Sequence, residues 1–168
     1  NYHFFHNLRG YDGHLLIRAL KKRYGHVRVI PNNIERYLSI STGRVQFLDS
    51  FQFTMKSLDD LTATMADEDF VLTRQMFPTD DIFYLVKRKG SFPYDFFDSI
   101  PKLDSVTKFP PRSSFFNKLE DKECSVEGYL HGQLVWDTFK CQSFREYHDL
   151  YLKSDLLLLT DFFEKFRR

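Results

Sequence analysis

The segment Phe5-His6-Asn7-Leu8-Arg9-Gly10-Tyr11-Asp12-Gly13 sets the expected fold class of this chain of 168 residues. Residues 2–5, which run into it, are rich in aromatic side chains and predict the end of a buried strand. After a loop, Asp12 and Gly13 open a helix with leucines on one face and basic residues on the other. A strand followed at once by a helix, early in the chain, predicts the α/β class.

The rest of the chain predicts further strands and then helices. Residues 26–30 predict a strand, with a turn after it at Pro31-Asn32-Asn33. Residues 36–41 and 44–51 predict a hairpin around Thr42-Gly43. Other predictions are an N-capped helix after Ser57, helices over 79–87, 126–139 and 143–167 (the last capped by Ser143), and an irregular insertion at about 91–125. One domain over residues 1–168 is expected, because one core can be buried at this length.

Composition narrows the class of protein. A hydrophobic share of 42% indicates a globular chain. No apolar run approaches the ~20 residues of a membrane span, and the two cysteines have no metal-ligand spacing, which favours a reduced intracellular protein. The net charge is +1, yet residues 1–30 hold six Lys and Arg against the single acid Asp12. The chain does not begin with Met, so we expect a fragment.

Asp12 is the first candidate functional residue. It lies between a predicted loop and the start of a predicted helix. An ordinary helix N-cap is one interpretation of such an aspartate. The other is a carboxylate that binds a metal ion at the mouth of a site.

Tyr151 and Asp155 form the second candidate pair. They are four residues apart within the last predicted helix, so they share a helix face. The pair could be a buried tyrosine beside an exposed aspartate. Alternatively, the carboxylate binds Mg²⁺ and the tyrosine orients an attacking water.

Lys89, in the segment Lys89-Gly90-Ser91-Phe92, is the third candidate. The basic run Lys87-Arg88-Lys89 is consistent with a solvated loop. The functional interpretation is a cation that neutralises a scissile phosphate.

Taken together and in this order, these segments resemble the proofreading 3′–5′ exonuclease domain of protein-primed family-B DNA polymerases. Asn7 with Tyr11-Asp12 looks like the second exonuclease motif, and Tyr151 with Asp155 looks like the third, Tyr-x-x-x-Asp. Lys89 to Phe92 looks like the Lys-x-x-hydrophobic motif. Ser57 to Leu61 looks like the Ser/Thr-Leu-x-x-hydrophobic motif, which contacts single-stranded DNA and the terminal protein. The connecting sequence is similar to polymerases of Polinton/Maverick-type transposons and their viral relatives.

The resemblance implies a ribonuclease H-like fold, with a mixed sheet, flanking helices and proofreading activity by two-metal phosphodiester hydrolysis. Four carboxylates of that family hold two Mg²⁺ or Mn²⁺ ions ~3.5–4 Å apart. By position, Asp12 and Asp155 would be metal ligands, Tyr151 would hold the water and Lys89 would bind the phosphate. The residues that would position the single-stranded 3′ end are His6, Asn7, Tyr11, Ser57, Leu58 and, less closely matched, Phe4.

The first exonuclease motif, Asp-x-Glu, departs from this pattern. It should precede Asn7, but none of the six residues there is acidic. No polymerase motif of the YxDTDS type occurs either. We therefore expect an N-terminally truncated domain that binds metal weakly and has little nuclease activity alone, with DNA-directed polymerisation confined to a longer parent.

Three other interpretations stay open at this point. The chain could be a non-catalytic module that binds single-stranded DNA or a terminal (priming) protein. It could be a self-standing nuclease completed by a partner chain, or an unrelated α/β domain. The polymerase interpretation implies a polymerase domain in cis, no membrane, and an intracellular location: the nucleus for a transposon enzyme, or the viral replication site.

Overall fold

The computed structural model describes residues 1–8, 13–33, 36–119 and 121–167. The chain is α/β, with a mixed four-stranded sheet and helices, which confirms the class expected from the sequence. It forms two compact units, residues 1–57 and 58–168. The expectation of one domain stays a prediction. Within the described ranges, no helix has the length and apolar character to span a membrane.

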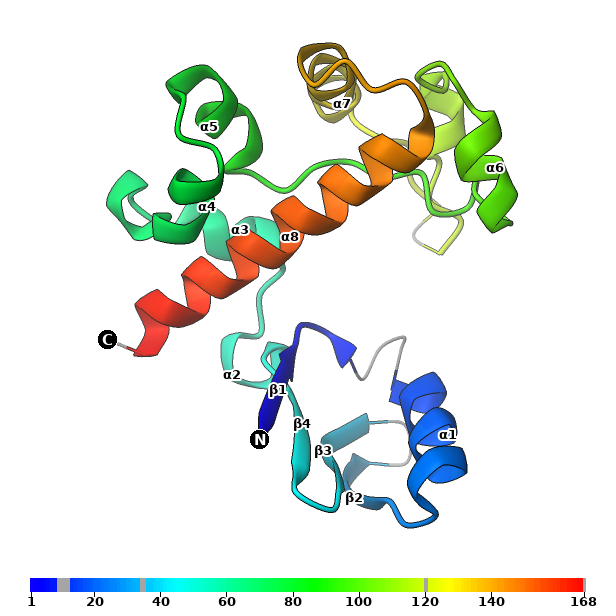
Figure 1. Ribbon diagram of the computed structural model, residues 1–168, viewed down its shortest axis with the longest axis vertical. Helices are drawn as coiled ribbons and strands as arrows, with labels where there is room; N and C mark the ends of the chain where they lie inside the picture. The colour runs from blue at the N-terminus through cyan, green and yellow to red at the C-terminus, as the bar shows by residue number, and fades with distance from the viewer. Residues whose placement is uncertain (9–12, 34–35, 120, 168) are drawn as a thin grey trace. The chain divides into compact units, whose positions relative to one another are not determined.

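The N-terminal unit is built on a sheet with the strand order β1-β4-β3-β2 (Figure 1). Strand β1 pairs parallel to β4, whereas β4 with β3 and β3 with β2 are antiparallel. Phe5 and Asp49 are partners in the β1–β4 register, so these two strands end together. Its elements are β1 (Tyr2–Phe5), α1 (Gly13–Tyr24), β2 (Arg28–Asn33), β3 (Arg36–Thr42), β4 (Val45–Asp49) and α2 (Phe51–Thr54).

A small core joins α1 to the sheet. Leu20 of α1 and Ile40 of β3 are buried there, and Leu16 and Ile17 pack against them. Gly25 ends α1 with φ of +72°, a conformation that glycine adopts without a Cβ clash.

Three predictions in this unit need correction. The strand at residues 2–5 exists but is not buried, because β1 is an edge strand; the Tyr2 side chain is 66% exposed. Strand β2 begins at Arg28 and continues through the predicted turn, since register shifts on both sides of Pro31 accommodate the missing N–H. The hairpin is confirmed, but its turn is Gly43-Arg44, because Thr42 pairs with Val45, and β4 ends at Asp49, where the helix α2 follows.

The C-terminal unit is helical and is organised around α8 (Phe144–Arg167), whose predicted extent is confirmed. Helices α3 and α4 pack against α8, and so does α6 (Figure 1). The helices predicted over 79–87 and 126–139 are confirmed, with small differences at their ends. The elements before α8 are α3 (Leu58–Ala63), η2 (Asp67–Asp69), α4 (Val71–Met76), α5 (Asp80–Val86), α6 (Ile100–Ser105), η3 (Arg112–Phe115) and α7 (Val126–Thr138).

Aromatic side chains fill the main core of this unit. Phe144 is fully buried and lies among Trp136, Tyr147 and Phe109. The predicted irregular insertion at 91–125 is only partly correct. It contains α6 and η3, and its Phe92, Phe97 and Phe109 pack into this core. A second cluster consists of Leu58, Phe70, Phe83 and Leu158.

Candidate functional site

One face of α8 carries the candidate residues of the C-terminal unit. Tyr147, Tyr151 and Asp155 are spaced by four, so the helix places them above one another. The two tyrosines are buried, at 2% and 7% exposure, and Asp155 is half-buried. The interpretation of Asp155 as an exposed surface aspartate is therefore wrong.

The segment Lys89-Gly90-Ser91-Phe92 lies against this helix face. A Cβ on Gly90 would approach Cδ2 of Tyr151 to 3.3 Å, so the absence of a side chain lets the backbone pack on the ring. The Tyr147 hydroxyl donates a 2.8 Å hydrogen bond to the carbonyl of Ser91. The ring centroids of Phe92 and Tyr151 are 5.1 Å apart. Two motifs that are far apart in the sequence thus meet in one place.

Tyr151 is held as a neutral hydrogen-bonding group. Its hydroxyl lies 2.7 Å from the hydroxyl of Tyr94, and it also interacts with the carboxylate of Asp155. Burial, followed by the nearby negative charge of Asp155, raises the pKa of Tyr151 far above its ordinary value of 10. The phenol therefore stays protonated at physiological pH and can donate a hydrogen bond.

The carboxyl group of Asp155 is largely shielded from water. Burial raises its pKa from 3.8 to about 6, against the opposing effects of the Lys89 charge and the Tyr151 hydrogen bond. The carboxylate of Asp59 on α3 also raises this pKa. Oδ1 of Asp155 is buried and accepts no hydrogen bond from any described residue. A buried carboxylate oxygen that has no hydrogen-bond donor is suited to binding a cation.

Lys89 supplies a positive charge beside this carboxylate. The two preceding basic residues form salt bridges with other side chains. Lys87 pairs with Asp67 at 2.7 Å, and Arg88 pairs with Glu127 at 2.9 Å. Lys89 is half-buried and forms no salt bridge with any residue in the described ranges. Of the basic run at 87–89, Lys89 is the member left able to bind a phosphate.

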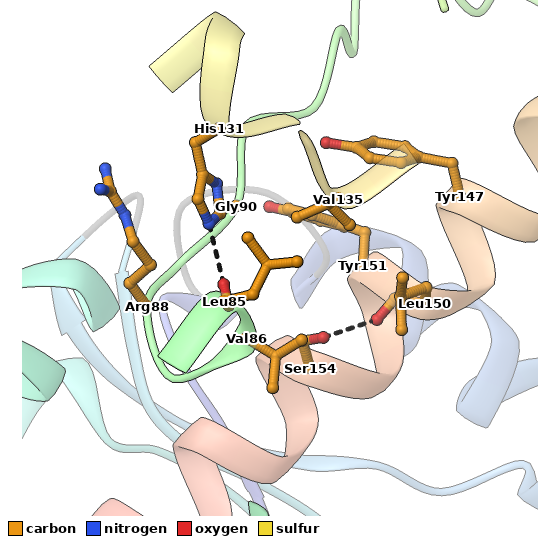
Figure 2. A pocket seen from close by; sticks show the side chains of 10 residues that line it. All are labelled: Leu85, Val86, Arg88, Gly90, His131, Val135, Tyr147, Leu150, Tyr151 and Ser154. Atoms are coloured by element: carbon orange, nitrogen blue, oxygen red, sulfur yellow. Dashed lines mark hydrogen bonds between the residues drawn. The ribbon is translucent and has the colours of Figure 1, made fainter. Parts of the chain in front are cut away.

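A small cavity adjoins Gly90 and Tyr151 (Figure 2). Its volume is about 20 Å³, enough for one water molecule and too small for a nucleotide base. On one wall, Nε2 of His131 lies 2.8 Å from the carbonyl of Leu85, and burial lowers the pKa of this histidine, which keeps it neutral. On another, the Ser154 hydroxyl donates a 2.9 Å hydrogen bond to the carbonyl of Leu150. A nucleic acid strand would therefore have to approach over the outer surface.

The fit of a divalent metal is partial. Asp155 offers a suitable oxygen, but among the described residues no three His, Cys, Asp or Glu side chains gather into a ligand set. Mg²⁺ commonly binds through one or two carboxylates and completes its shell with water and phosphate oxygens. The residues present fit that kind of site, with Asp155 as the protein ligand.

The candidates in the N-terminal unit lie where β1 and β4 end. Nδ1 of His6 is 2.9 Å from the hydroxyl of Ser50, and the backbone N–H of Asn7 donates to Oδ1 of Asp49 at 2.8 Å. Asn7 has φ of +62°, which asparagine tolerates better than most residues. Phe4 is 48% exposed. Tyr11 and Asp12 lie outside the described residues.

Ser57 and Leu58 differ in how they could meet DNA. Ser57 is exposed. Leu58 is 6% exposed and packs with Phe83 and Leu158, so its side chain serves the core. Their DNA-binding roles stay predictions.

Sequence reasoning missed Tyr94 and Asp59. A Tyr two residues beyond the Lys89–Phe92 segment and an acid inside the Ser57–Leu61 segment were the available signals, but neither indicates proximity to α8. The contacts arise only from the tertiary packing.

No family model, curated protein or solved structure matches the chain. Function is therefore inferred from the residues and their geometry. The described geometry unites Lys89, Tyr151 and Asp155 within the C-terminal unit, while His6, Asn7 and Phe4 belong to the N-terminal unit.

Proposed function

We propose that this chain belongs to the proofreading 3′–5′ exonuclease domain of a protein-primed family-B DNA polymerase, with a ribonuclease H-like fold. In this proposal Lys89, Tyr151 and Asp155 are part of the exonuclease site. The observation that carries it is the buried Oδ1 of Asp155, which has no hydrogen-bond donor among the described residues and lies in the field of Lys89. The mixed α/β sheet is compatible with the proposed fold.

Each residue has a distinct role in the proposal. Asp155 binds a divalent cation, and a metal-binding role for Asp12 stays a prediction from the order of the motifs. Lys89 neutralises the phosphate, and the oxygen of the protonated Tyr151 orients the attacking water by accepting a hydrogen bond from it. When bound, the cation would supply Lewis-acid stabilisation of charge on the leaving 3′ oxygen.

Gly90 and Tyr94 position Tyr151 from two sides. The Gly90 backbone supports the ring, and Tyr94 holds the hydroxyl at 2.7 Å. A phenol fixed at both ends loses little further freedom when it orients a water, which favours catalysis.

Mn²⁺ binding tests the proposal without requiring turnover. Calorimetric titration of the intact chain at pH 8 should show binding that Asp155→Asn weakens at least about tenfold, because the substitution removes the anionic ligand. Asp137→Asn is the matched control, since Asp137 is an exposed aspartate on α7. Equal binding by wild type and Asp155→Asn would refute the metal role.

A second measurement separates the nuclease from the alternative of a non-catalytic binding module. A labelled single strand is incubated with the chain and Mn²⁺, and trimming is compared with binding. Slow 3′ trimming that Asp155→Asn abolishes supports the nuclease. Binding that is insensitive to both Asp155→Asn and Lys89→Ala, with no trimming, supports the module instead.

A further inference from the structure

Charge is divided unevenly along the chain. Residues 1–57 hold nine Lys and Arg against three Asp and Glu, whereas residues 58–168 hold fifteen against twenty. The near-neutral total therefore conceals a strongly basic N-terminal unit and an acidic C-terminal unit. Clustered basic charge is the electrostatic footprint of nucleic-acid binding.

The outer face of α1 concentrates this charge. Arg18, Lys21 and Lys22 are spaced by three and four residues, so they lie on the same side of the helix. All three are exposed, while Leu16 and Leu20 occupy the side that packs on the sheet. None of the three cations forms a salt bridge with a described residue.

Exposed groups at the end of α1 extend this surface. Arg23 ends the basic run of the last turn. Tyr24, at the end of α1, is 61% exposed. A tyrosine ring beside cations offers a stacking surface for an unpaired base.

Stabilisation of the helix itself does not account for all of this charge. Basic residues in the last turn interact favourably with the helix dipole, which explains Lys21, Lys22 and Arg23. Arg18 lies in the middle of the helix, so it does not gain from that effect. The excess over the whole unit also remains.

We propose that the outer face of α1, formed by Arg18, Lys21 and Lys22, binds the phosphate backbone of nucleic acid without sequence preference. This contact is distinct in chemistry from the Lys89–Asp155 site, because it requires neither a metal ion nor hydrolysis. It rests on the proposed function only for the choice of DNA as the ligand.

The test is the salt dependence of DNA binding by the intact chain in EDTA. Fluorescence anisotropy is measured with labelled oligothymidine and with a duplex over a series of salt concentrations. The triple substitution Arg18→Gln, Lys21→Gln and Lys22→Gln should reduce the log–log salt slope for the single strand by about 2, because each lost phosphate contact removes about 0.7. Glutamine keeps the helix propensity close to that of the residues replaced.

The control variant removes the same amount of charge elsewhere. Lys108, Lys118 and Lys122 are exposed lysines of the C-terminal unit, and their joint replacement by Gln should leave the slope close to that of wild type. If the α1 triple variant is unstable, single Arg18→Gln and Lys22→Gln variants should each lower the slope by about 0.7. Identical slopes for the α1 variants and the control would refute the proposal.

Two further outcomes separate this inference from the others. The Asp155→Asn variant should bind DNA in EDTA with the same log–log salt slope as wild type. The α1 contact can therefore be confirmed even if the proposed metal site is refuted. Sedimentation tests whether the basic face instead binds the acidic unit of a second copy. Self-association that the α1 triple variant abolishes, with DNA binding unchanged, would overturn the proposal.

Discussion

The two units differ in how they use their side chains. The N-terminal unit has the helix α1 against a four-stranded sheet, a small aliphatic core around Leu20 and Ile40, and an excess of basic residues. The C-terminal unit has a large aromatic core around Phe144 and Tyr147, and it is acidic. The first is suited to attracting a polyanion, and the second to holding a few polar groups rigidly in place.

A second contrast separates the carboxylates of the molecule from one another. Asp49 accepts backbone N–H bonds from Asn7 and Phe51, and Asp161 accepts them from Leu72 and Thr73. Both carboxylates therefore stabilise the fold. Asp155 has a buried Oδ1 that no described residue satisfies, so its position has a cost that the fold does not recover. Such a cost is typical of functional groups, and it is consistent with the cation-binding role that we propose for Asp155.

Replacing Phe144 with Ala should have the largest effect on stability, because it removes the centre of the aromatic core of the C-terminal unit. The Phe144 side chain is fully buried among other aromatic rings, so its removal should lower the free energy of unfolding by about 4 kcal/mol. Trp136, the only tryptophan, lies 5.9 Å from its ring and reports the loss by fluorescence in urea. Phe166→Ala is the control, because that ring is 66% exposed. Equal effects of the two substitutions would contradict the aromatic core.

The fold can be predicted from the sequence where the signals are local. Ser125 caps α7 by accepting a hydrogen bond from the N–H of Gly128, and the glycine of the turn Gly43-Arg44 marks the hairpin of β3 and β4. The short helix α4 has no such signal, since Phe70 occupies its N-cap position. The N–H groups of Leu72 and Thr73 in α4 are satisfied by Asp161, which lies far along the chain in α8, and no local pattern reveals this.

The candidate site can be predicted in part for the same reason. Spacing and resemblance select Lys89, Tyr151 and Asp155, and the structure brings them together. The hydrogen bond of Tyr94 and the close approach of Gly90 depend on packing between α8 and a segment much earlier in the chain. The burial of Asp155 depends on that packing too, and helix spacing does not reveal it.

Asp155→Asn should stabilise the metal-free chain at pH 8. The pKa of Asp155 is about 6 in the folded chain and near 3.8 in the unfolded chain, so the folded state binds its proton more tightly. Stability is therefore lost as pH rises from about 4 to above 6, and the neutral Asn avoids this loss. We expect a gain of about 3 kcal/mol at pH 8, most of which is lost near pH 4.

Urea unfolding in EDTA, followed by Trp136 fluorescence at both pH values, measures this gain. Asp137→Asn is again the control, and it should show little change between the two pH values because Asp137 is exposed. Added Mn²⁺ should stabilise wild type more than Asp155→Asn. A loss of stability at pH 8 in Asp155→Asn would show that the carboxylate is a satisfied structural group like Asp161.

Gly25→Ala is expected to have the smallest effect, about 1 kcal/mol, and it concerns the N-terminal unit. Gly25 ends α1 with φ of +72°, and a Cβ at this position would have no neighbouring atom within 4 Å, so the cost comes from the backbone alone. Hydrogen exchange at the amide of Leu20 should become faster. Gly25→Asn should cost less, because asparagine tolerates this conformation better. Equal exchange in all three proteins would mean that the end of α1 does not limit the stability of the basic face.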